Sequence, residues 1–150
     1  MKLNTEVIID ASLDEVWGAF EDSRNLGRWQ QNFVSFTQKS GVPGQPGSVA
    51  ELTYDEKGRT IVLTETIAER REQEFMAASY ESRYGATLIV NRFEEVGSSA
   101  TRWTTWCNFK FNGVMKLMSL FSGGAIRNRI EGDMQRFKLM VESDHAGVLR

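Results

Sequence analysis

The segment Val7–Trp29 constrains the fold more than any other part of the sequence. Val7–Ile9 are three β-branched residues in a row, which favours a strand, and the turn residues Asp10–Ser12 then end it. A helix is predicted to begin at this turn because Ser12 and Glu15 have the spacing of a capping box, which satisfies free backbone amides of the first turn. A second short helix is predicted to end at Trp29. The segment therefore predicts a strand followed by two short helices.

Six further segments of strand-forming residues follow, and short turns that contain glycine separate most of them. Turns of two or three residues suit hairpins, whereas parallel strands need much longer crossovers. We therefore predict an antiparallel meander, which with the first strand makes a sheet of seven. The six segments are Phe33–Gln38, Ser48–Asp55, Thr60–Arg70, Glu74–Ser82, Ala86–Glu95 and Ala100–Phe111.

After Phe111 the pattern changes from alternation to the spacing of a helix. Apolar residues recur every three or four positions, which predicts a long amphipathic helix with one apolar stripe. Gly123-Gly124 interrupts the pattern, and each glycine costs about 1 kcal/mol in a helix relative to alanine. We therefore predict a short helix, a break or kink at the two glycines that acts as a hinge, and a long helix. The stripe of the long helix consists of Ile126, Ile130, Met134, Phe137 and Val141.

Composition limits the classes of function. A chain of 150 residues fits one domain, 1–150, and its net charge of -2 gives no positive field for nucleic acid or an anionic membrane. The sequence contains no secretory signal and no apolar run long enough to span a bilayer. We therefore expect a cytoplasmic protein with no nucleic-acid partner and no integral membrane association.

The chain has one cysteine, Cys107, and one histidine, His145. This excludes a disulfide within the chain and a metal site built from several cysteines, so we expect no metal. Cys107 is interpreted as a small buried hydrophobic residue. His145 lies five residues from the end, where an imidazole suits a helix C-terminus better than a catalytic site.

The sequence resembles the SRPBCC superfamily, which includes START domains, birch-pollen-allergen relatives and polyketide cyclase/dehydrase and lipid transport proteins. The resemblance implies an α+β helix-grip fold, in which a curved seven-stranded antiparallel sheet with two short helices after its first strand wraps around a long C-terminal helix. It also implies an apolar cavity between the sheet and that helix. The matching residues are Ile9, Ala11, Glu15, Val16-Trp17, Asp22 and Trp29.

Alternation along the strands predicts which side chains face this cavity, although a shift of one residue would exchange the two faces of a strand. Met118 and Phe121 are interpreted either as a gate or ligand contact at the cavity mouth, or as ordinary packing or a dimer contact. The predicted ligand-binding residues are Leu63, Phe75, Ile89, Trp103, Phe109, Met118, Phe121, Ile126, Ile130 and Met134.

Glu65, Tyr80 and Asn91 are the candidate catalytic residues. A carboxylate in an apolar cavity has a raised pKa unless it is paired, so an inward Glu65 would suit a general acid or base, with Tyr80 or Asn91 polarising a carbonyl. The alternative is that all three are structural and that Glu65 lies in solvent. The same two interpretations, an inward or a solvent-exposed carboxylate, apply to Glu51 and Glu81.

Three functions follow from these observations. The first is binding or transport of a small hydrophobic or amphipathic ligand, such as a lipid, polyketide or aromatic metabolite, without a cofactor. The second is a metal-free enzyme of the cyclase or dehydratase kind that uses a cavity carboxylate. The third is a protein-interaction or regulatory module, and a homodimer is compatible with each of them. Fold alone does not decide among these functions.

Overall fold

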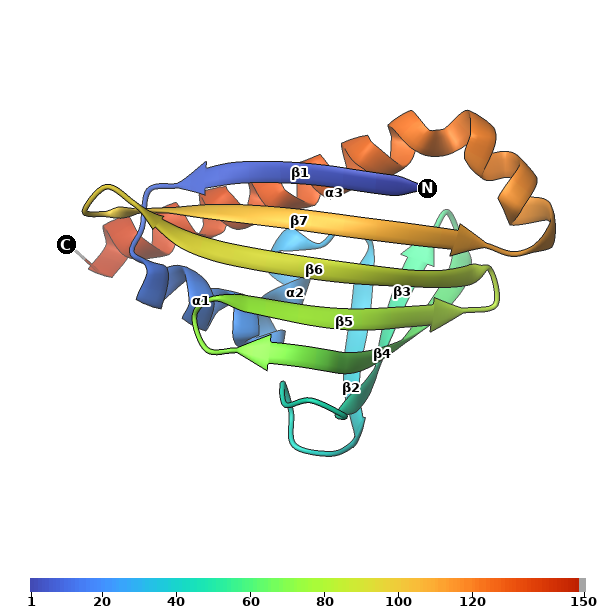
Figure 1. Ribbon diagram of the computed structural model, residues 1–150, viewed down its shortest axis with the longest axis horizontal. Coiled ribbons are helices and arrows are strands. Elements are labelled where there is room, and N and C mark those ends of the chain that lie inside the picture. The colour runs from blue at the N-terminus through green and yellow to red at the C-terminus, as the bar shows by residue number, and fades with distance from the viewer. Residues whose placement is uncertain (149–150) are drawn as a thin grey trace.

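The structure, a computed structural model, describes the backbone of residues 1–148 and the side chains of residues 1–113 and 124–148. Figure 1 shows the arrangement of the elements. They are β1 (Lys2–Ile9), α1 (Leu13–Glu21), the 3-10 helix η1 (Ser23–Asn25), α2 (Leu26–Trp29), β2 (Phe33–Ser40), β3 (Val49–Glu56), β4 (Arg59–Arg71), β5 (Phe75–Ser82), β6 (Gly85–Val96), β7 (Ala100–Phe111) and α3 (Gly113–Val148).

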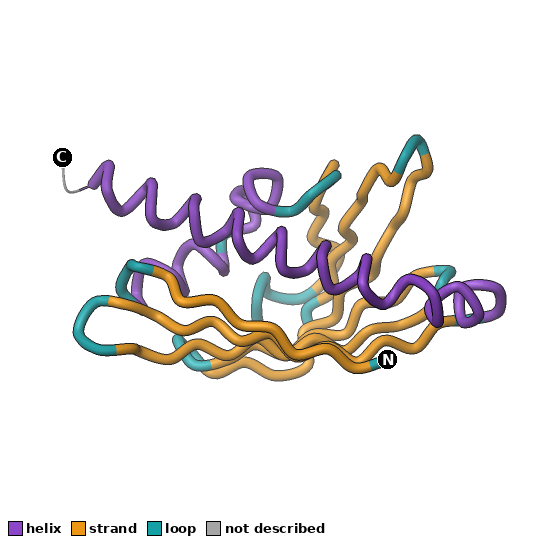
Figure 2. The backbone as a smooth tube through the Cα atoms, turned by 90° about the horizontal axis from the view of Figure 1, so that it is seen from above, coloured by secondary structure: helices purple, strands orange, loops and turns teal. Residues whose placement is uncertain are grey.

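The seven strands form one antiparallel sheet in the order β1-β7-β6-β5-β4-β3-β2. This confirms the predicted meander, and the first strand pairs with the last. The sheet curves strongly. This is visible in Figure 1, where β2 and β3 run steeply across the direction of β5, β6 and β7. The helix α3 lies along the inner side of this curve (Figure 2) and packs against β1, β7 and α2. The helix-grip architecture predicted from the sequence is confirmed.

The capped start of α1 is also present, and it joins the two ends of the chain. The Glu15 amide donates to Ser12 Oγ at 3.2 Å, and Ser12 Oγ donates to the Glu15 carboxylate at 3.0 Å. The same carboxylate lies 2.7 Å from Nδ1 of His145 in the last turns of α3. Partial burial alone would raise the pKa of Glu15, but the hydrogen bonds with His145 and Ser12 lower it overall. His145 therefore holds α3 against α1.

The long helix is continuous from Gly113 to Val148, so the two glycines do not break it, and of the predicted break or kink only a kink is compatible with the structure. Glycine keeps its backbone amide, unlike proline, so a helix can bend at glycine and still continue its hydrogen bonds. Figure 1 shows such a bend in the first part of α3, before the long straight part. Within the described residues, no helix combines the length and the apolarity needed to cross a membrane.

An aromatic cluster forms the core at the α1 end of the sheet. Trp103 is its centre, with ring centroids 4.8 Å from Phe137, 5.7 Å from Phe20 and 5.8 Å from Trp29. Trp103 and Phe137 are almost completely buried, and both belong to the same core as Trp17 and Phe93. The tryptophans of the N-terminal segment therefore close one end of the curved sheet.

Candidate functional site

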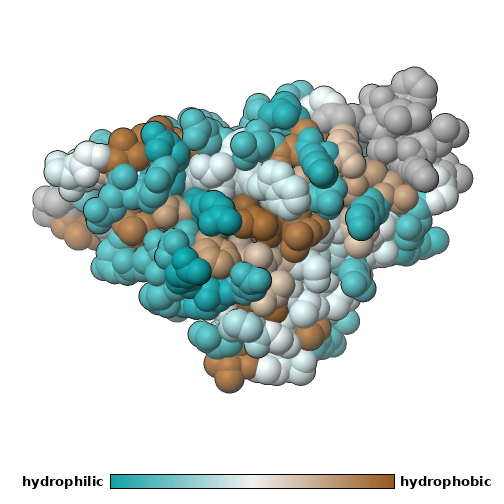
Figure 3. Space-filling model, viewed as in Figure 1, coloured by the Kyte–Doolittle hydropathy of each residue, from teal (hydrophilic) through white to brown (hydrophobic). Residues whose placement is uncertain are grey.

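A pocket of about 630 Å³ lies between the inner face of the sheet and α3. Its volume falls within the roughly 300–1,000 Å³ of pockets that hold drug-sized ligands, and its lining is mostly apolar, as such pockets require. The outer side of the sheet carries mostly hydrophilic residues, with a group of apolar residues near its middle (Figure 3). The pocket is therefore an apolar concavity on the inner side of the sheet, large enough for a small ligand.

Six of the ten predicted ligand-binding residues line this pocket. They lie on three strands and on the inner side of α3, so the alternation used to place them is correct for β4, β6 and β7. Whether they contact a ligand remains a prediction. The six residues are Leu63, Ile89, Trp103, Phe109, Ile130 and Met134.

Phe75 does not line the pocket, so its predicted inward position is wrong. Met76 and Ala78 face inward instead, and the Phe75 ring lies between the guanidinium groups of Arg71 and Arg92, each 5.2 Å from its centroid. The strand is apolar on both faces near its start, so alternation alone does not decide which face is buried.

Three predicted contacts on α3 have other outcomes. Ile126 is half-buried and lies one turn before Ile130 on the same side of the helix, but it does not line the pocket. The side chains of Met118 and Phe121 lie outside the described residues, so the gate or dimer contact predicted there stays a prediction.

Glu65 and Tyr80 face the pocket as a pair. They are direct cross-strand partners on β4 and β5, and Tyr80 Oη donates to Glu65 Oε2 at 2.7 Å. Burial raises the pKa of Glu65, and the hydrogen bond from Tyr80 offsets only part of this effect. Burial also raises the pKa of Tyr80, and the neighbouring carboxyl raises it further. The pair is a protonatable group in an apolar environment.

The other two glutamates considered in the sequence do not have this environment. The Glu51 side chain is 42% exposed and lies 3.6 Å from Lys39. Glu81 is exposed next to the inward Tyr80 on the same strand. Of these three carboxylates, only Glu65 enters the pocket.

Asn91 also lines the pocket, and its orientation is fixed by its neighbours. Trp103 Nε1 and Thr105 Oγ1 both donate to Asn91 Oδ1, at 2.9 and 2.7 Å. An indole nitrogen can only donate, so the atom that it contacts must be the amide oxygen. The amide nitrogen has no hydrogen-bond partner among the described side chains, and it is the group that Asn91 can offer to a ligand.

The register separates Asn91 from the Glu65–Tyr80 pair. Tyr80 pairs with Thr87 on β6, and Asn91 is four residues further along that strand. At about 3.3 Å per residue, the two polar groups are about 13 Å apart along the strand direction. A single reacting carbonyl therefore cannot contact both, and the predicted grouping of Glu65 with Asn91 in one catalytic arrangement is wrong.

Asp133 on α3 is a pocket residue that the sequence analysis missed. Its carboxylate accepts from the Gln31 amide at 3.1 Å and pairs with Arg136. Burial raises its pKa, although these contacts and nearby Arg129 act in the opposite direction. Its spacing of three residues from Ile130 is the signal that would have placed it on the inner side of the helix.

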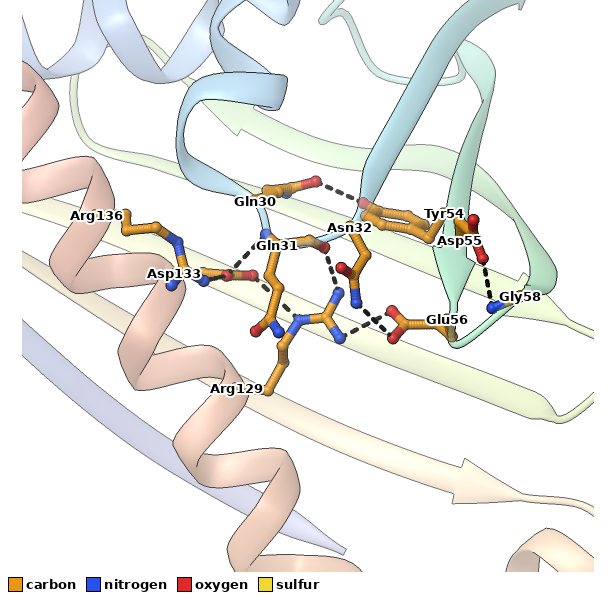
Figure 4. A network of polar contacts seen from close by, with 10 residues as sticks. All are labelled: Gln30, Gln31, Asn32, Tyr54, Asp55, Glu56, Gly58, Arg129, Asp133 and Arg136. Atoms are coloured by element: carbon orange, nitrogen blue, oxygen red, sulfur yellow. Dashed lines mark hydrogen bonds and ion pairs between the residues drawn. The ribbon is translucent and has the colours of Figure 1, made fainter.

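Asp133 belongs to a polar network that attaches α3 to the rest of the pocket wall (Figure 4). Arg129 contacts Glu56 of β3 at 2.8 Å and donates to the Gln31 carbonyl at 2.6 Å. Tyr54 Oη donates to Gln30 Oε1 at 2.5 Å, which links β3 to the same connection after α2. The network fixes the width of the pocket on the side where α3 makes few contacts with the sheet.

Cys107 and the possible metal ligands were the other reactive groups considered in the sequence. Burial raises the pKa of Cys107 to about 12, so its side chain is a neutral thiol rather than a nucleophilic thiolate. No three described His, Cys, Asp or Glu side chains are grouped so that they could hold a metal ion. Glu65, Tyr80 and Asn91 all line the pocket, and they stay candidates for a catalytic role.

The raised pKa of Glu65 predicts how stability depends on pH. Below its ordinary pKa of 4.5 the carboxyl is protonated in both the folded and unfolded states. As pH rises above that value the unfolded state loses its proton first, so the folded state holds more protons and loses stability until its own raised pKa is passed. The free energy of unfolding of Glu65→Gln should therefore rise relative to that of the wild type as pH rises from about 4.5 to 8. Urea denaturation at a series of pH values measures this difference. Glu81→Gln, on the exposed face, should show no such gain, and an equal gain in both variants would contradict this assignment.

Comparison with solved structures identifies many chains of the same fold. The TTHA0849 protein from Thermus thermophilus has a TM-score of 0.80 and 12% identity, with 96% of this chain and 99% of that chain covered. The Zhui aromatase/cyclase from Streptomyces sp. R1128 has a TM-score of 0.80 and 13% identity, with 95% and 93% covered. The structure of Ara h 8.0201 has a TM-score of 0.75 and 13% identity, with 95% and 98% covered. These similarities establish a shared fold.

Comparison with curated proteins finds no matching sequence. The family model described as "Polyketide cyclase / dehydrase and lipid transport" matches residues 1–141, which is nearly the whole chain. This confirms the resemblance to the SRPBCC superfamily. The chain belongs to the polyketide cyclase/dehydrase and lipid transport family.

Proposed function

We propose that this protein binds one small hydrophobic or amphipathic molecule in the pocket between the sheet and α3. The observation that carries the proposal is a mostly apolar pocket of about 630 Å³ with a few fixed polar groups. Apolar walls supply binding free energy through the hydrophobic effect, and the polar groups orient the ligand. The family description, which names lipid transport and polyketide chemistry, supports a ligand of this class.

Two measurements test this proposal. Native mass spectrometry of the protein purified from its own host should show a bound species at one molecule per chain. After the ligand is extracted, the neutral fluorophore N-phenyl-1-naphthylamine should bind saturably at one site, because its fluorescence rises in an apolar environment. Absence of a bound species together with absence of saturable fluorophore binding would contradict the proposal.

The Glu65–Tyr80 pair favours a second candidate function, acid–base catalysis on a bound ligand. Burial makes the ionised Glu65 a stronger base than an exposed glutamate. A positioned general base typically contributes 10²–10⁴-fold to a rate, so removal of a proton from carbon is within reach of this group.

The base can be tested with 5-nitrobenzisoxazole, an apolar probe that opens when a base removes its ring proton. Glu65 would take the proton while the N–O bond breaks, which releases a coloured cyanophenolate. The wild type should accelerate this reaction on the order of 10²-fold or more over Glu65→Gln. Glu81→Gln should keep the wild-type rate. Equal rates in wild type and Glu65→Gln would contradict the catalytic candidate and leave the binding proposal intact.

A further inference from the structure

We propose that the pocket selects an elongated ligand that donates a hydrogen bond to Glu65, through a hydroxyl or an ammonium group, and offers a carbonyl oxygen to Asn91. It excludes lipids that end in a free carboxylate. This inference rests on the proposed function, since it describes the ligand of the same pocket. It follows from which hydrogen-bonding groups are already used within the protein and which remain for a ligand.

The Glu65–Tyr80 pair offers acceptors. Tyr80 has one hydroxyl proton and donates it to Glu65 Oε2 at 2.7 Å, so it has none left for a ligand. Among the described residues, Glu65 Oε1 has no donor. A carboxylate that is taken out of water is stable only when its lone pairs are satisfied. A ligand donor at Oε1 would supply the missing bond, and an ammonium group would also balance the charge.

The charges near Glu65 do not favour a second carboxylate. The titratable groups that interact with it from the neighbouring strands β3 and β5 are Tyr54 and Tyr80, and burial raises the pKa of each, so both are neutral. At the α1 end of the pocket, the Arg70 side chain is only 11% exposed and already pairs with Glu21 and Glu72. An anionic headgroup in the middle of the pocket would therefore meet Glu65 without a compensating cation.

A carboxylate lipid has one alternative position. Lys110 lies at the opposite rim of the pocket, where its side chain is exposed. Water and salt screen an exposed charge, so such a pair contributes about 0–1 kcal/mol. This contribution is too small to offset the hydrogen bond that Glu65 Oε1 lacks when the ligand has no donor. The experiment below distinguishes this position from the proposed one.

Asn91 offers a donor. Its oxygen accepts from Trp103 and Thr105, and the residue is only 9% exposed, so its orientation is fixed before a ligand arrives. The amide nitrogen is left to donate to a carbonyl oxygen. Since this group is about 13 Å from the Glu65–Tyr80 pair along the strands, one ligand must be elongated to contact both.

The test compares ligands of one chain length for their displacement of N-phenyl-1-naphthylamine near pH 7. Dodecylamine is cationic at this pH, 1-dodecanol is neutral and dodecanoate is anionic. For the wild type we expect dodecylamine to bind at least about tenfold more tightly than dodecanoate, with 1-dodecanol between them. For Glu65→Gln, whose side chain is neutral and nearly the same shape, this difference should fall below about threefold. Glu81→Gln should keep the wild-type order, since its side chain lies outside the pocket.

A second comparison tests the Asn91 contact. Methyl 12-aminododecanoate carries an ammonium group and an ester carbonyl at opposite ends. It should bind the wild type several-fold more tightly than dodecylamine, because a neutral hydrogen bond contributes a factor of about this size. Asn91→Asp keeps the Oδ1 acceptor for Trp103 and Thr105 but loses the amide donor, so it should lose this gain.

The outcomes separate the two proposals. If the fluorophore binds and dodecanoate binds as tightly as dodecylamine, or more tightly, the selectivity inference is wrong while the binding proposal stands. Loss of dodecanoate binding in Lys110→Ala would then identify the rim lysine as the headgroup site. A wild-type preference that persists unchanged in Glu65→Gln would also overturn the inference. If no ligand displaces a saturable fluorophore, the binding proposal itself fails. Should a variant not fold, the comparison of ligands on the wild type still decides the question.

Discussion

Replacing Trp103 with alanine is expected to lower the free energy of unfolding by about 3–5 kcal/mol, the usual loss for a large buried aromatic residue. The side chain is 2% exposed and contacts rings from α1, α2, β6 and α3. The substitution also removes the indole donor to Asn91 Oδ1. The free energy of unfolding of a small domain is about 5–15 kcal/mol, so this loss is a large fraction of the stability of the protein. Urea denaturation measures it as a shift of the midpoint.

Two variants show whether this loss comes from the aromatic cluster. Trp106→Ala changes the same residue type on the same strand, but Trp106 is half-buried and lies on the outer face, so its loss should be clearly smaller. Trp103→Phe keeps an aromatic ring and loses the hydrogen bond, so it should fall between the wild type and Trp103→Ala. Similar losses for Trp103→Ala and Trp106→Ala would contradict the central role of the cluster.

Replacing Ala78 with tryptophan is expected to abolish most ligand binding without unfolding the protein. Ala78 lies on β5 between Ile67 and Ile89, in the middle of the row of side chains that faces the pocket. Enlarging a residue in a filled core usually costs about 1–3 kcal/mol through strain, but here the pocket provides space for the larger side chain. The affinity for N-phenyl-1-naphthylamine should fall at least about tenfold, which corresponds to about 1.4 kcal/mol.

The matched control adds the same ring on the other side of the sheet. Leu88 lies on β6 with its side chain 38% exposed on the outer face. Leu88→Trp should keep the wild-type affinity for the fluorophore. If Ala78→Trp folds and binds as tightly as the wild type, the ligand does not occupy this pocket.

The strands could be predicted from the sequence wherever only one face is apolar. The last strand, Ala100–Phe111, has the predicted bounds, and its alternation placed Trp103 and Phe109 correctly. Prediction failed at Phe75. Both faces of the strand are apolar there, and the sequence contains no signal that shows which face lies toward the pocket. The cation–π contacts of Arg71 and Arg92 with that ring depend on pairing across three strands.

The candidate site was only partly predictable, because its geometry depends on register between strands. Glu65 and Tyr80 could each be placed on an inner face, but their direct contact requires the β4–β5 pairing. The separation of Asn91 from that pair likewise requires the β5–β6 pairing. Asp133 was missed because a charged residue beside an apolar stripe usually lies in solvent. Whether the glycine pair in α3 would break or only bend the helix could not be decided from the sequence, because glycine weakens a helix without removing a backbone donor.

The most direct test of the account is to locate a bound ligand within the sheet by NMR. With methyl-labelled protein and N-phenyl-1-naphthylamine, we predict intermolecular NOEs from the fluorophore to the methyl groups of Ile67 and Ile89, which face the pocket. NOEs to Val62 and Leu88, which are exposed on the outer face, should be absent. NOEs to Val62 and Leu88 in place of Ile67 and Ile89 would contradict the central claim that the pocket between the sheet and α3 is the ligand site.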